Sequence, residues 1–171
     1  DNNYLDDDDD LDPTPKTPGT TRILILNITA IEHHFDSAVT NRKRDVDVWA
    51  LSETRHTRSY QSWFTALREA AGFKLLWGRP VNVDARTGLS AHGGVALITQ
   101  DTGYATCLDA EQLDLIEWLH STQRALLTRV YTGTGRLFYY IFTLYLAQGA
   151  TQDARSTNSA ILDATVQLAL T

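Results

Sequence analysis

Two short apolar runs, separated by one amphipathic stretch, constrain the fold of this 171-residue chain more than any other feature. The first run, Ile23–Leu26, is continuous, which is typical of a strand covered on both faces. Residues 32–44 place apolar side chains three and four positions apart, which predicts one amphipathic helix. The second run, 46–51, leads into Ser52 and Glu53. Strand, helix and strand within about thirty residues form a βαβ unit, so the sequence predicts an α/β fold.

The remaining pattern predicts further elements along the chain. We expect a helix over 60–71, strands over 73–77 and 93–99, a hairpin of 124–131 with 137–145, and a helix from 153 onward. The stretch 109–120 fits a short helix and irregular structure equally well. Residues 78–92 are rich in Pro, Asn, Gly and Ser, which predicts a long loop.

The charge is distributed unevenly between the N-terminal segment and the rest. Seven of the 21 acidic residues and one of the 15 basic residues precede residue 21, which leaves 14 of each in residues 21–171. Residues 1–20 are too charged and too poor in apolar groups to fold, so we expect a disordered, acidic, Pro-rich tail. The neutral remainder lacks the broad basic surface of a protein that binds nucleic acid mainly by neutralising phosphates. Any contact with a polyanion is therefore expected to be local.

Polar side chains follow both strands of the predicted βαβ unit. Asn27 ends the first strand and Glu53 follows the second. Because parallel strands end at the same edge of a sheet, we expect the amide and the carboxylate to lie close together. Their hard oxygens suit Mg²⁺, which binds through one or two carboxylates and shares its other positions with water and substrate phosphates. The same two residue types are also common as turn formers and helix caps, and the spacing alone leaves both interpretations open.

Tyr145 ends the second strand of the predicted hairpin. A phenol at the rim of the sheet could hydrogen-bond a phosphate oxygen or relay a proton. Residues 138–145 are also simply rich in aromatic side chains, which is ordinary for a strand. The sequence pattern does not decide between these alternatives.

Together these segments resemble the endonuclease/exonuclease/phosphatase family, also called DNase I-like. Members of that family begin with an apolar strand ending in Asn, similar to Ile23–Asn27 here, and continue to a strand ending in Gln-Glu, similar to Val48–Glu53. A Gly-Gly-Val-Ala-Leu-Ile strand follows, matched by residues 93–98, and then an Asn-Val-Tyr-x-Pro segment, matched loosely by 143–147. The strand Phe73–Gly78 and the element Gln123–Ala125 look most like the endonucleases of retroelements.

The resemblance implies a fold, a cofactor and a set of site residues. It implies a four-layer α/β/β/α sandwich and a metal-dependent phosphodiesterase, with Mg²⁺ or Mn²⁺ held by Glu53 and Asn27. It also implies that Tyr145 contacts the phosphate, and that the substrate of the complete enzyme is nucleic acid, with DNA favoured over RNA. Ser52, Thr143 and Ala147 depart from the family pattern, in which Gln, Asn and Pro stand at these positions.

The likeness runs from about residue 22 to the end of the chain. The Gly-Asp-Phe-Asn and Ser-Asp-His motifs, which orient and deprotonate the attacking water in the family, are absent from these 171 residues. We therefore expect residues 21–171 to form a partial sandwich, truncated at its C-terminus and inactive alone. A non-catalytic relic of a retroelement protein and a lipid or inositol-phosphate phosphodiesterase are the alternatives. The sequence shows no signal peptide and no apolar run long enough to cross a membrane, and it does not indicate a cellular compartment.

Overall fold

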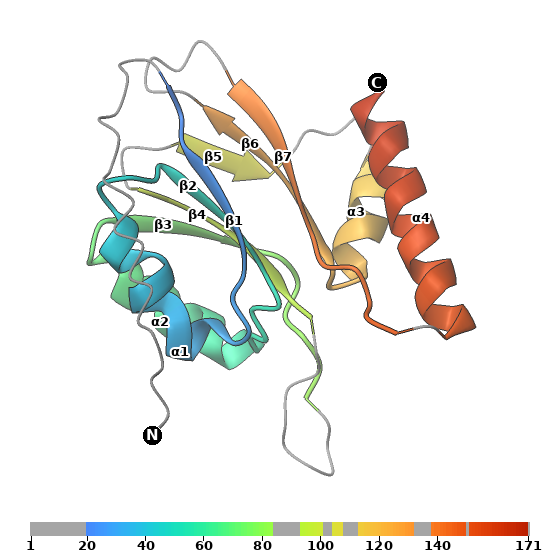
Figure 1. Cartoon of the computed structure of the whole chain (residues 1–171), viewed down its shortest axis with the longest axis horizontal. Helices are drawn as coiled ribbons and strands as arrows, with labels where there is room; N and C mark the ends of the chain where they lie inside the picture. Colours follow the sequence, from blue (N-terminus) through green and yellow to red (C-terminus); the bar gives the residue numbers. More distant parts are fainter. Residues whose placement is uncertain are drawn as a thin grey trace, which may run out of the picture.

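The computed structural model describes residues 20–83, 93–100, 104–107, 113–131, 138–149 and 151–170 (Figure 1). For residues 104–107 and for Leu113 only the backbone is described. The predicted acidic tail, apart from Thr20, and most of the predicted 78–92 loop lie outside the described residues.

The first sheet contains the predicted βαβ unit. Its strand order is β1 (Ile23–Asn27), β2 (Val48–Ser52), β4 (Val95–Gln100) and β3 (Phe73–Trp77). Strands β1 and β2 are parallel, as expected, with Asn27 paired to Ser52. Strand β4 is antiparallel to both β2 and β3. Two helices, α1 (Ile31–Ala38) and α2 (Arg58–Glu69), cover one face of this sheet.

The helix expected over 32–44 is shorter than predicted. α1 ends at Ala38, and a separate 3-10 turn covers Thr40–Arg42. Thr and Asn, which occupy positions 40 and 41, are weak helix formers, so the amphipathic pattern alone overestimated the length of the helix.

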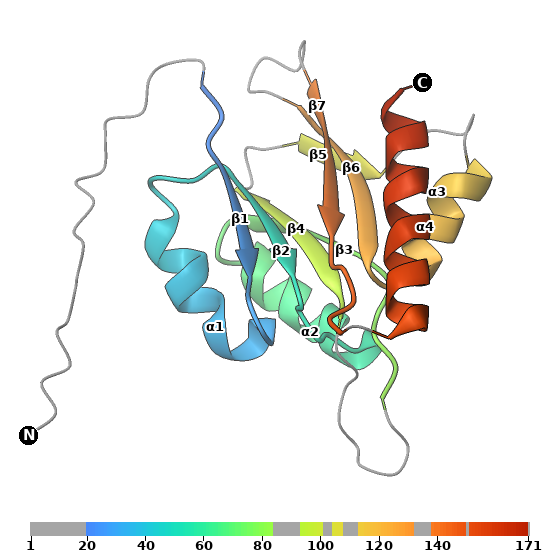
Figure 2. The ribbon, with the colours of Figure 1, turned by 45° about the vertical axis from the view of Figure 1, so that its right-hand side comes forward.

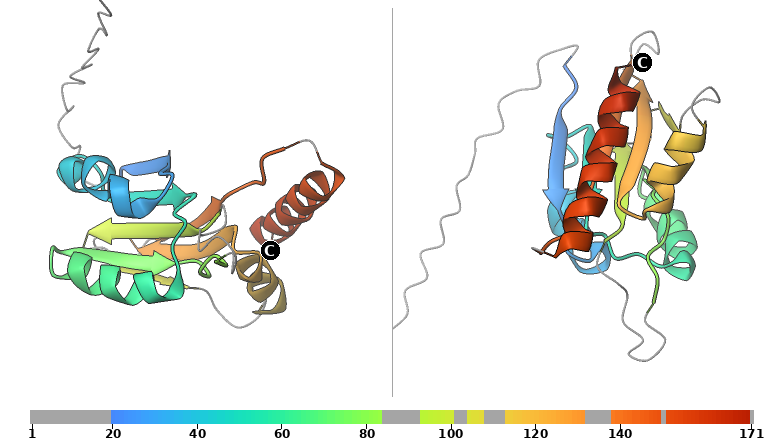
Figure 3. Two further views of the ribbon diagram at one scale, coloured as in Figure 1. Left: turned by 90° about the horizontal axis from the view of Figure 1, so that it is seen from below. Right: turned by 90° about the vertical axis from the view of Figure 1, so that its right-hand side faces the viewer.

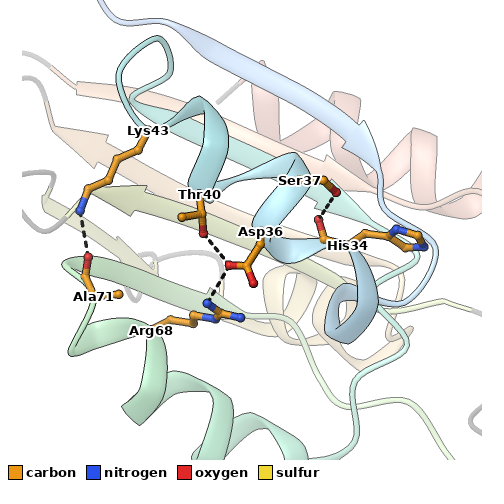
Figure 4. Close-up of polar contacts among 7 residues, drawn as sticks. All are labelled: His34, Asp36, Ser37, Thr40, Lys43, Arg68 and Ala71. Atoms are coloured by element: carbon orange, nitrogen blue, oxygen red, sulfur yellow. Dashed lines mark hydrogen bonds and ion pairs between the residues drawn. The ribbon is translucent and has the colours of Figure 1, made fainter. Parts of the chain in front are cut away.

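Side chains of α1 and the turn tie this segment to α2 (Figure 4). Asp36 Oδ1 accepts hydrogen bonds from Thr40 Oγ1 at 2.9 Å and from Arg68 Nη1 at 3.0 Å. Lys43 Nζ donates to the carbonyl of Ala71 at 2.9 Å, just beyond the C-terminus of α2. A cation at this end of a helix satisfies a terminal carbonyl and complements the helix dipole.

An aromatic core lies between the first sheet and its two helices. The rings of Phe35 and Phe64 meet edge to face at 5.0 Å, and those of Phe35 and Phe73 at 5.5 Å. Trp49 is fully buried against Phe73. Such contacts add to the stabilisation from burying apolar surface, and they fix α1 and α2 on the sheet.

The second sheet has the order β5 (Tyr104–Cys107), β6 (Ala125–Tyr131) and β7 (Phe138–Leu144), with antiparallel neighbours. Strands β6 and β7 are the predicted hairpin. The ambiguous region contains a helix, α3 (Leu113–Ser121), and α4 (Gln152–Ala169) is the predicted last helix. Strand β5 was not predicted from the sequence. Helices α3 and α4 share an apolar cluster with β6, which includes Leu119, Ala125 and Ile161.

The two sheets pack face to face through small and branched apolar side chains. The cluster between them includes Val48, Ala50, Val95, Leu97, Leu126, Val130 and Tyr145. Helices α1 and α2 lie outside the first sheet, and α3 and α4 lie outside the second (Figures 2 and 3). The predicted α/β/β/α layering is therefore confirmed.

Strand β1 departs from the prediction that it is covered on both faces. Leu24 and Leu26 pack against the aromatic core, but Ile23 is 44% exposed and Ile25 is 78% exposed. Strand β1 is an edge strand, and the described part of the second sheet does not extend over it. The continuous apolar run therefore predicted a strand correctly. The prediction that both faces of this strand are covered was wrong. None of the helices in the described ranges has the length and apolar character that a membrane span requires.

Candidate functional site

Glu53 lies in a buried loop directly after β2. Its carboxylate is 8% exposed and accepts a hydrogen bond from Arg55, with 2.7 Å between Nη2 and Oε1. Burial makes this ion pair stronger than one on the surface, because water screens it less. The pair holds the carboxylate in one orientation at the carboxyl edge of the first sheet.

Residues with a left-handed backbone gather around this edge. In the described part of the chain, positive φ occurs at five non-glycine residues: Thr29, Ala30, Glu53, Arg55 and Gln123. All five lie in loops at the ends of β1 and β2 or at the start of β6. Such a conformation costs of the order of 1–3 kcal/mol per residue and persists only where the surroundings impose it.

Backbone hydrogen bonds between neighbouring loops impose this conformation. Ala30 N donates to the carbonyl of Glu53 at 2.9 Å, and Arg55 N donates to the carbonyl of Gly93 at 3.0 Å. Gly94 N in turn donates to the carbonyl of Gln123 at 3.1 Å. The loops that follow β1 and β2 are thereby joined to the loops that precede β4 and β6.

Gly94 must be glycine for two reasons. Its φ is +82°, and a Cβ atom there would lie 2.6 Å from Thr54 Oγ1. This close approach explains the glycine at position 94, which lets the Glu53 loop lie directly against the start of β4.

His56 anchors the far end of the Glu53 loop. Its ring is 1% exposed, with Nδ1 2.6 Å from Thr54 Oγ1 and Nε2 3.2 Å from the carbonyl of Gly78. Burial lowers the pKa of His56 to about 4, although the Gly78 carbonyl opposes this shift. A neutral ring with both nitrogens engaged supports the loop and is not available to take a proton from water.

Tyr145 comes from the second sheet to the same edge. It is 6% exposed and belongs to the cluster between the sheets, so its ring is packed in the core, one of the two alternatives that the sequence left open. Burial raises the pKa of its phenol, the Glu53 carboxylate raises it further, and Arg124 and Arg55 lower it. The structure thus brings Tyr145 into the electrostatic field of Glu53, and the phenol stays protonated at neutral pH.

The segment around Tyr145 is fixed from both sides. Its backbone N–H donates to the carbonyl of Arg124 at 2.7 Å. Two residues later, Ala147 donates to Asn158 Oδ1 at 2.7 Å and accepts from Asn158 Nδ2 at 3.0 Å. Helix α4, which carries Asn158, therefore helps to position the phenol.

Asn27 ends β1 beside the end of β2. By the alternation of side chains along β1, it lies on the same sheet face as Ile23 and Ile25, the face directed toward the second sheet. Its Oδ1 accepts hydrogen bonds from Thr29 N at 3.2 Å and from Thr29 Oγ1 at 3.1 Å. Asn27 thus forms an Asx-type turn, the role that the sequence left open beside metal binding.

Solved structures with the same layered architecture include a DNA-bound 3′ phosphatase and AP endonucleases. A 3′ phosphatase, NExo from Neisseria, bound to a product DNA hairpin, has a TM-score of 0.56 and 12% identity over 86% of this chain. An AP endonuclease from Leishmania major has a TM-score of 0.56 and 12% identity over 84% of it. The human Nocturnin catalytic domain, with a bound sulfate anion, has a TM-score of 0.55 and 17% identity over 86% of it. A comparison with protein-family models gives no match, and neither does one with curated proteins.

The chain is therefore an α/β/β/α sandwich with the same layers as these structures. More particularly, it has the DNase I-like fold of the endonuclease/exonuclease/phosphatase family, as its sequence motifs suggested. It spans 51%, 47% and 57% of the NExo, Leishmania and Nocturnin chains, respectively. It thus corresponds to about half of such a domain.

Two hard oxygen donors lie at this edge, the Glu53 carboxylate and the Asn27 amide. Within the described ranges, no group of three or more His, Cys, Asp or Glu side chains is placed to hold a metal ion. The Glu53 carboxylate and the Asn27 amide are nevertheless hard oxygen donors on adjacent strand ends, which meets the small requirement of Mg²⁺ for protein ligands. Water and a substrate phosphate would supply the remaining positions.

Sequence reasoning missed Arg55, His56 and Arg124 as members of this site. Arg55 and His56 lie two and three positions after Glu53. The ion pair of Arg55 with Glu53 and the burial of His56 depend on how this loop folds against β4. Arg124 precedes β6 and reaches the site through its contact with Tyr145, with Cζ 5.3 Å from the ring centroid. Its place beside a predicted hairpin strand was visible in the sequence, but its proximity to Tyr145 depends on the pairing of β6 with β7.

Proposed function

We propose that residues 21–171 form part of the active site of a Mg²⁺- or Mn²⁺-dependent phosphodiesterase that cleaves nucleic acid, with DNA favoured over RNA. The observation that carries the proposal is the meeting of Glu53 and Tyr145 at one edge of a DNase I-like sandwich. The NExo neighbour is bound to a DNA hairpin, which supports a nucleic-acid substrate.

The metal would be held by Glu53 and Asn27. When bound, the ion supplies positive charge that stabilises a phosphodiester as negative charge develops on its oxygens. The chain's own residues then have separate tasks. Arg55 orients the Glu53 carboxylate in the absence of the ion, and the protonated phenol of Tyr145 donates a hydrogen bond to a phosphate oxygen.

The described residues near Glu53 offer no base for the attacking water. His56 is neutral, but both of its ring nitrogens are already engaged. Tyr145 is a protonated phenol, and Arg55 and Arg124 are permanent cations. We therefore propose that residues 1–171 bind metal and substrate without turnover, and that catalysis requires further residues of a complete domain.

The first experiment measures Mn²⁺ binding by electron paramagnetic resonance for the wild-type chain and for Glu53→Gln. We expect Glu53→Gln to weaken binding at least about tenfold, since it removes the charged ligand and keeps its shape. Glu69→Gln is the matched control, because Glu69 is exposed at the end of α2, and it should bind as the wild type does. Equal affinity in all three proteins would contradict the metal site.

The second experiment tests the substrate class by incubating the wild-type chain and Glu53→Gln with Mg²⁺ and supercoiled plasmid, and separately with phosphorylated lipids. We expect no product from either substrate with residues 1–171. Turnover that requires both Mg²⁺ and Glu53 would show that the chain carries its own general base, and the substrate consumed would identify the class.

A further inference from the structure

One end of the second sheet carries aromatic side chains that its helices leave partly uncovered. The outer face of β6 and β7 packs against α3 and α4 near Ala125. Farther along these strands the same face presents Arg129, Tyr131, Phe138 and Tyr140. Phe138 is 45% exposed and Tyr140 is 49% exposed. We call the four residues from Arg129 to Tyr140 on this face the aromatic platform.

Contacts within the aromatic platform place a guanidinium among the rings. Arg129 Nη2 donates to Tyr140 Oη at 2.9 Å, and Arg129 Nη1 donates to Tyr131 Oη at 3.3 Å. The Cζ atom of Arg129 lies 4.9 Å from the ring centroid of Phe138 and 5.3 Å from that of Tyr140. The rings of Phe138 and Tyr140 meet edge to face at 5.3 Å. The platform therefore combines apolar ring surface with one positive charge.

The chemistry of the aromatic platform fits an acidic, proline-rich segment. Proline-rich segments favour the polyproline II conformation, and surfaces lined by aromatic rings bind them with little further loss of conformational entropy. Within the described strands β6 and β7, Arg129 carries the only formal charge. A segment that contains carboxylates is therefore attracted to this surface.

The chain itself contains a segment of this chemistry. Residues 1–19 include Pro13, Pro15 and Pro18 together with seven Asp residues, and Lys16 is their one basic residue. Polyproline II has three residues per turn, so in that conformation Pro15 and Pro18 would lie on the same side of the segment. A composition that cannot fold alone is compatible with ordering on a binding surface.

The acidic segment joins the sandwich at the end where the aromatic platform lies. It leads into β1, which starts at Ile23 and runs parallel to β2. Tyr145, after the end of β7, meets Glu53, after the end of β2, so β1, β2 and β7 all start at the opposite end (Figures 1 and 2). From Pro13 to Thr20 the chain advances seven residues, or about 22 Å in polyproline II at about 3.1 Å per residue. Packed sheets lie about 10 Å apart and neighbouring strands about 5 Å apart, so this length is enough to pass from β1 to the outer face of β7.

We propose that the aromatic platform binds residues 12–18 of the same chain. The proline rings pack against Phe138 and Tyr140, and Asp12 lies close to the guanidinium of Arg129. This interaction fastens the acidic segment to the end of the sandwich opposite the candidate site. It does not depend on the metal site or on the proposed function.

Trypsin cleavage after Lys16 measures this interaction in the 171-residue chain. Lys16 is the only Lys or Arg before Arg22, so the release of residues 1–16, followed by mass spectrometry, reports on this one bond. We expect release from the chain to be at least about fivefold slower than from a synthetic peptide of residues 1–21, because trypsin cleaves only the segment that is not bound. Equal rates in the chain and the peptide would overturn the proposal.

An aromatic double variant locates the binding surface. Phe138→Ser combined with Tyr140→Ser should bring the cleavage rate to within about twofold of that of the peptide, because it removes the ring surface on which the prolines pack. Trp63→Ser is the matched control, since Trp63 is an exposed aromatic residue on α2, and it should keep the wild-type rate. Circular dichroism checks that both variants are folded. Wild-type protection in the folded double variant would overturn the proposal.

An arginine variant tests the contribution of charge. Arg129→Gln should speed cleavage about threefold or more, because it removes the positive charge that attracts the Asp residues. Arg58→Gln is the control, since Arg58 is exposed at the start of α2, and it should cleave as the wild type does. Equal acceleration by both variants would reduce the effect to net charge and overturn the proposal.

Two measurements on the wild-type chain do not depend on the folding of a variant. Raising the NaCl concentration from about 0.02 M to about 0.5 M should bring the cleavage rate of the chain closer to that of the peptide, because salt screens the attraction. A ratio of the two rates that salt does not change would contradict the proposal. The ratio should also be the same at low and high protein concentration. Protection that increases with concentration would place the segment on a second copy of the chain and overturn binding within one molecule.

Discussion

The two sheets of this protein are covered to different extents. The first sheet has an aromatic core on its helical side, where Phe35, Phe64 and Trp49 are no more than 1% exposed. On the second sheet, β7 leaves Phe138, Tyr139 and Tyr140 between 45% and 49% exposed. The described part of β7 is therefore less well covered than the helical side of the first sheet, and the candidate site draws residues from both sheets.

The candidate site joins the two differently covered sheets. Glu53 and Arg55 are held by the well-packed first sheet, and Arg124 and Tyr145 are held by the second. The link between them is the inter-sheet cluster, to which Tyr145 itself belongs. The comparison predicts which substitutions disturb the fold and which leave it intact.

The largest effect is expected from a substitution in the aromatic core. Phe64→Ala should lower the free energy of unfolding by about 3–5 kcal/mol, since it leaves a cavity among Phe35, Tyr60 and Trp77. Urea denaturation followed by circular dichroism measures this change. Trp63→Ala, one residue earlier on α2 and 58% exposed, should cost less than about 1 kcal/mol.

Urea denaturation of a β7 variant tests whether the second sheet is less stabilising than the first. Tyr139→Ala should also cost less than about 1 kcal/mol, because this side chain is 48% exposed. A loss as large as that of Phe64→Ala would show that the second sheet is as stabilising as the first.

The second prediction concerns the pH dependence of stability. The folded state keeps His56 neutral down to about pH 4, whereas the unfolded chain takes up a proton near pH 6.5. The stabilisation is therefore complete above pH 6.5 and is lost as the pH falls toward 4, by about 3 kcal/mol in total. Burial also lowers the pKa of His120, which adds to the loss in the same direction.

Urea denaturation at pH 7.5, 6, 5 and 4 measures this loss. His56→Gln should flatten the profile, and His34→Gln, which changes an exposed histidine, should leave it unchanged. If the profile of His56→Gln matched the wild type over this range, His56 would not be the group responsible.

The smallest effect is expected on the uncovered face of β1. Ile25→Ala should change the free energy of unfolding by less than about 0.5 kcal/mol, since the side chain is already 78% exposed. Leu24→Ala, on the opposite face of the same strand, should cost about 1–2 kcal/mol because Leu24 packs against the aromatic core. Equal effects at the two positions would mean that the inner face of β1 is covered in solution.

Much of the fold followed from local sequence patterns. The apolar runs identified β1, β2 and β3, and the hairpin of β6 and β7 followed from its length and its glycines. The insertion of β4 between β2 and β3 could not be predicted, because strand order depends on contacts between distant segments. Strand β5 was missed because the four residues Tyr104–Cys107 are too few to show a period.

The site was predictable only in outline. Adjacent parallel strands brought the ends of β1 and β2 together, so the neighbourhood of Asn27 and Glu53 was expected. The roles of Arg55 and Arg124 were not, because they depend on left-handed loop conformations that few sequence signals reveal in residues other than glycine. The binding roles assigned to Asn27, Glu53 and Tyr145 remain predictions.

The hydrogen bonds that join the loops from Ala30 to Gln123 have a consequence for how this protein could be changed. These backbone hydrogen bonds connect four separate loops. A substitution that moves one loop therefore also moves the loops to which it is hydrogen-bonded. Single substitutions in these loops are expected to lose binding more often than they change its specificity. New specificities would then arise from coordinated replacements in several loops, or from side chains that point away from the shared backbone.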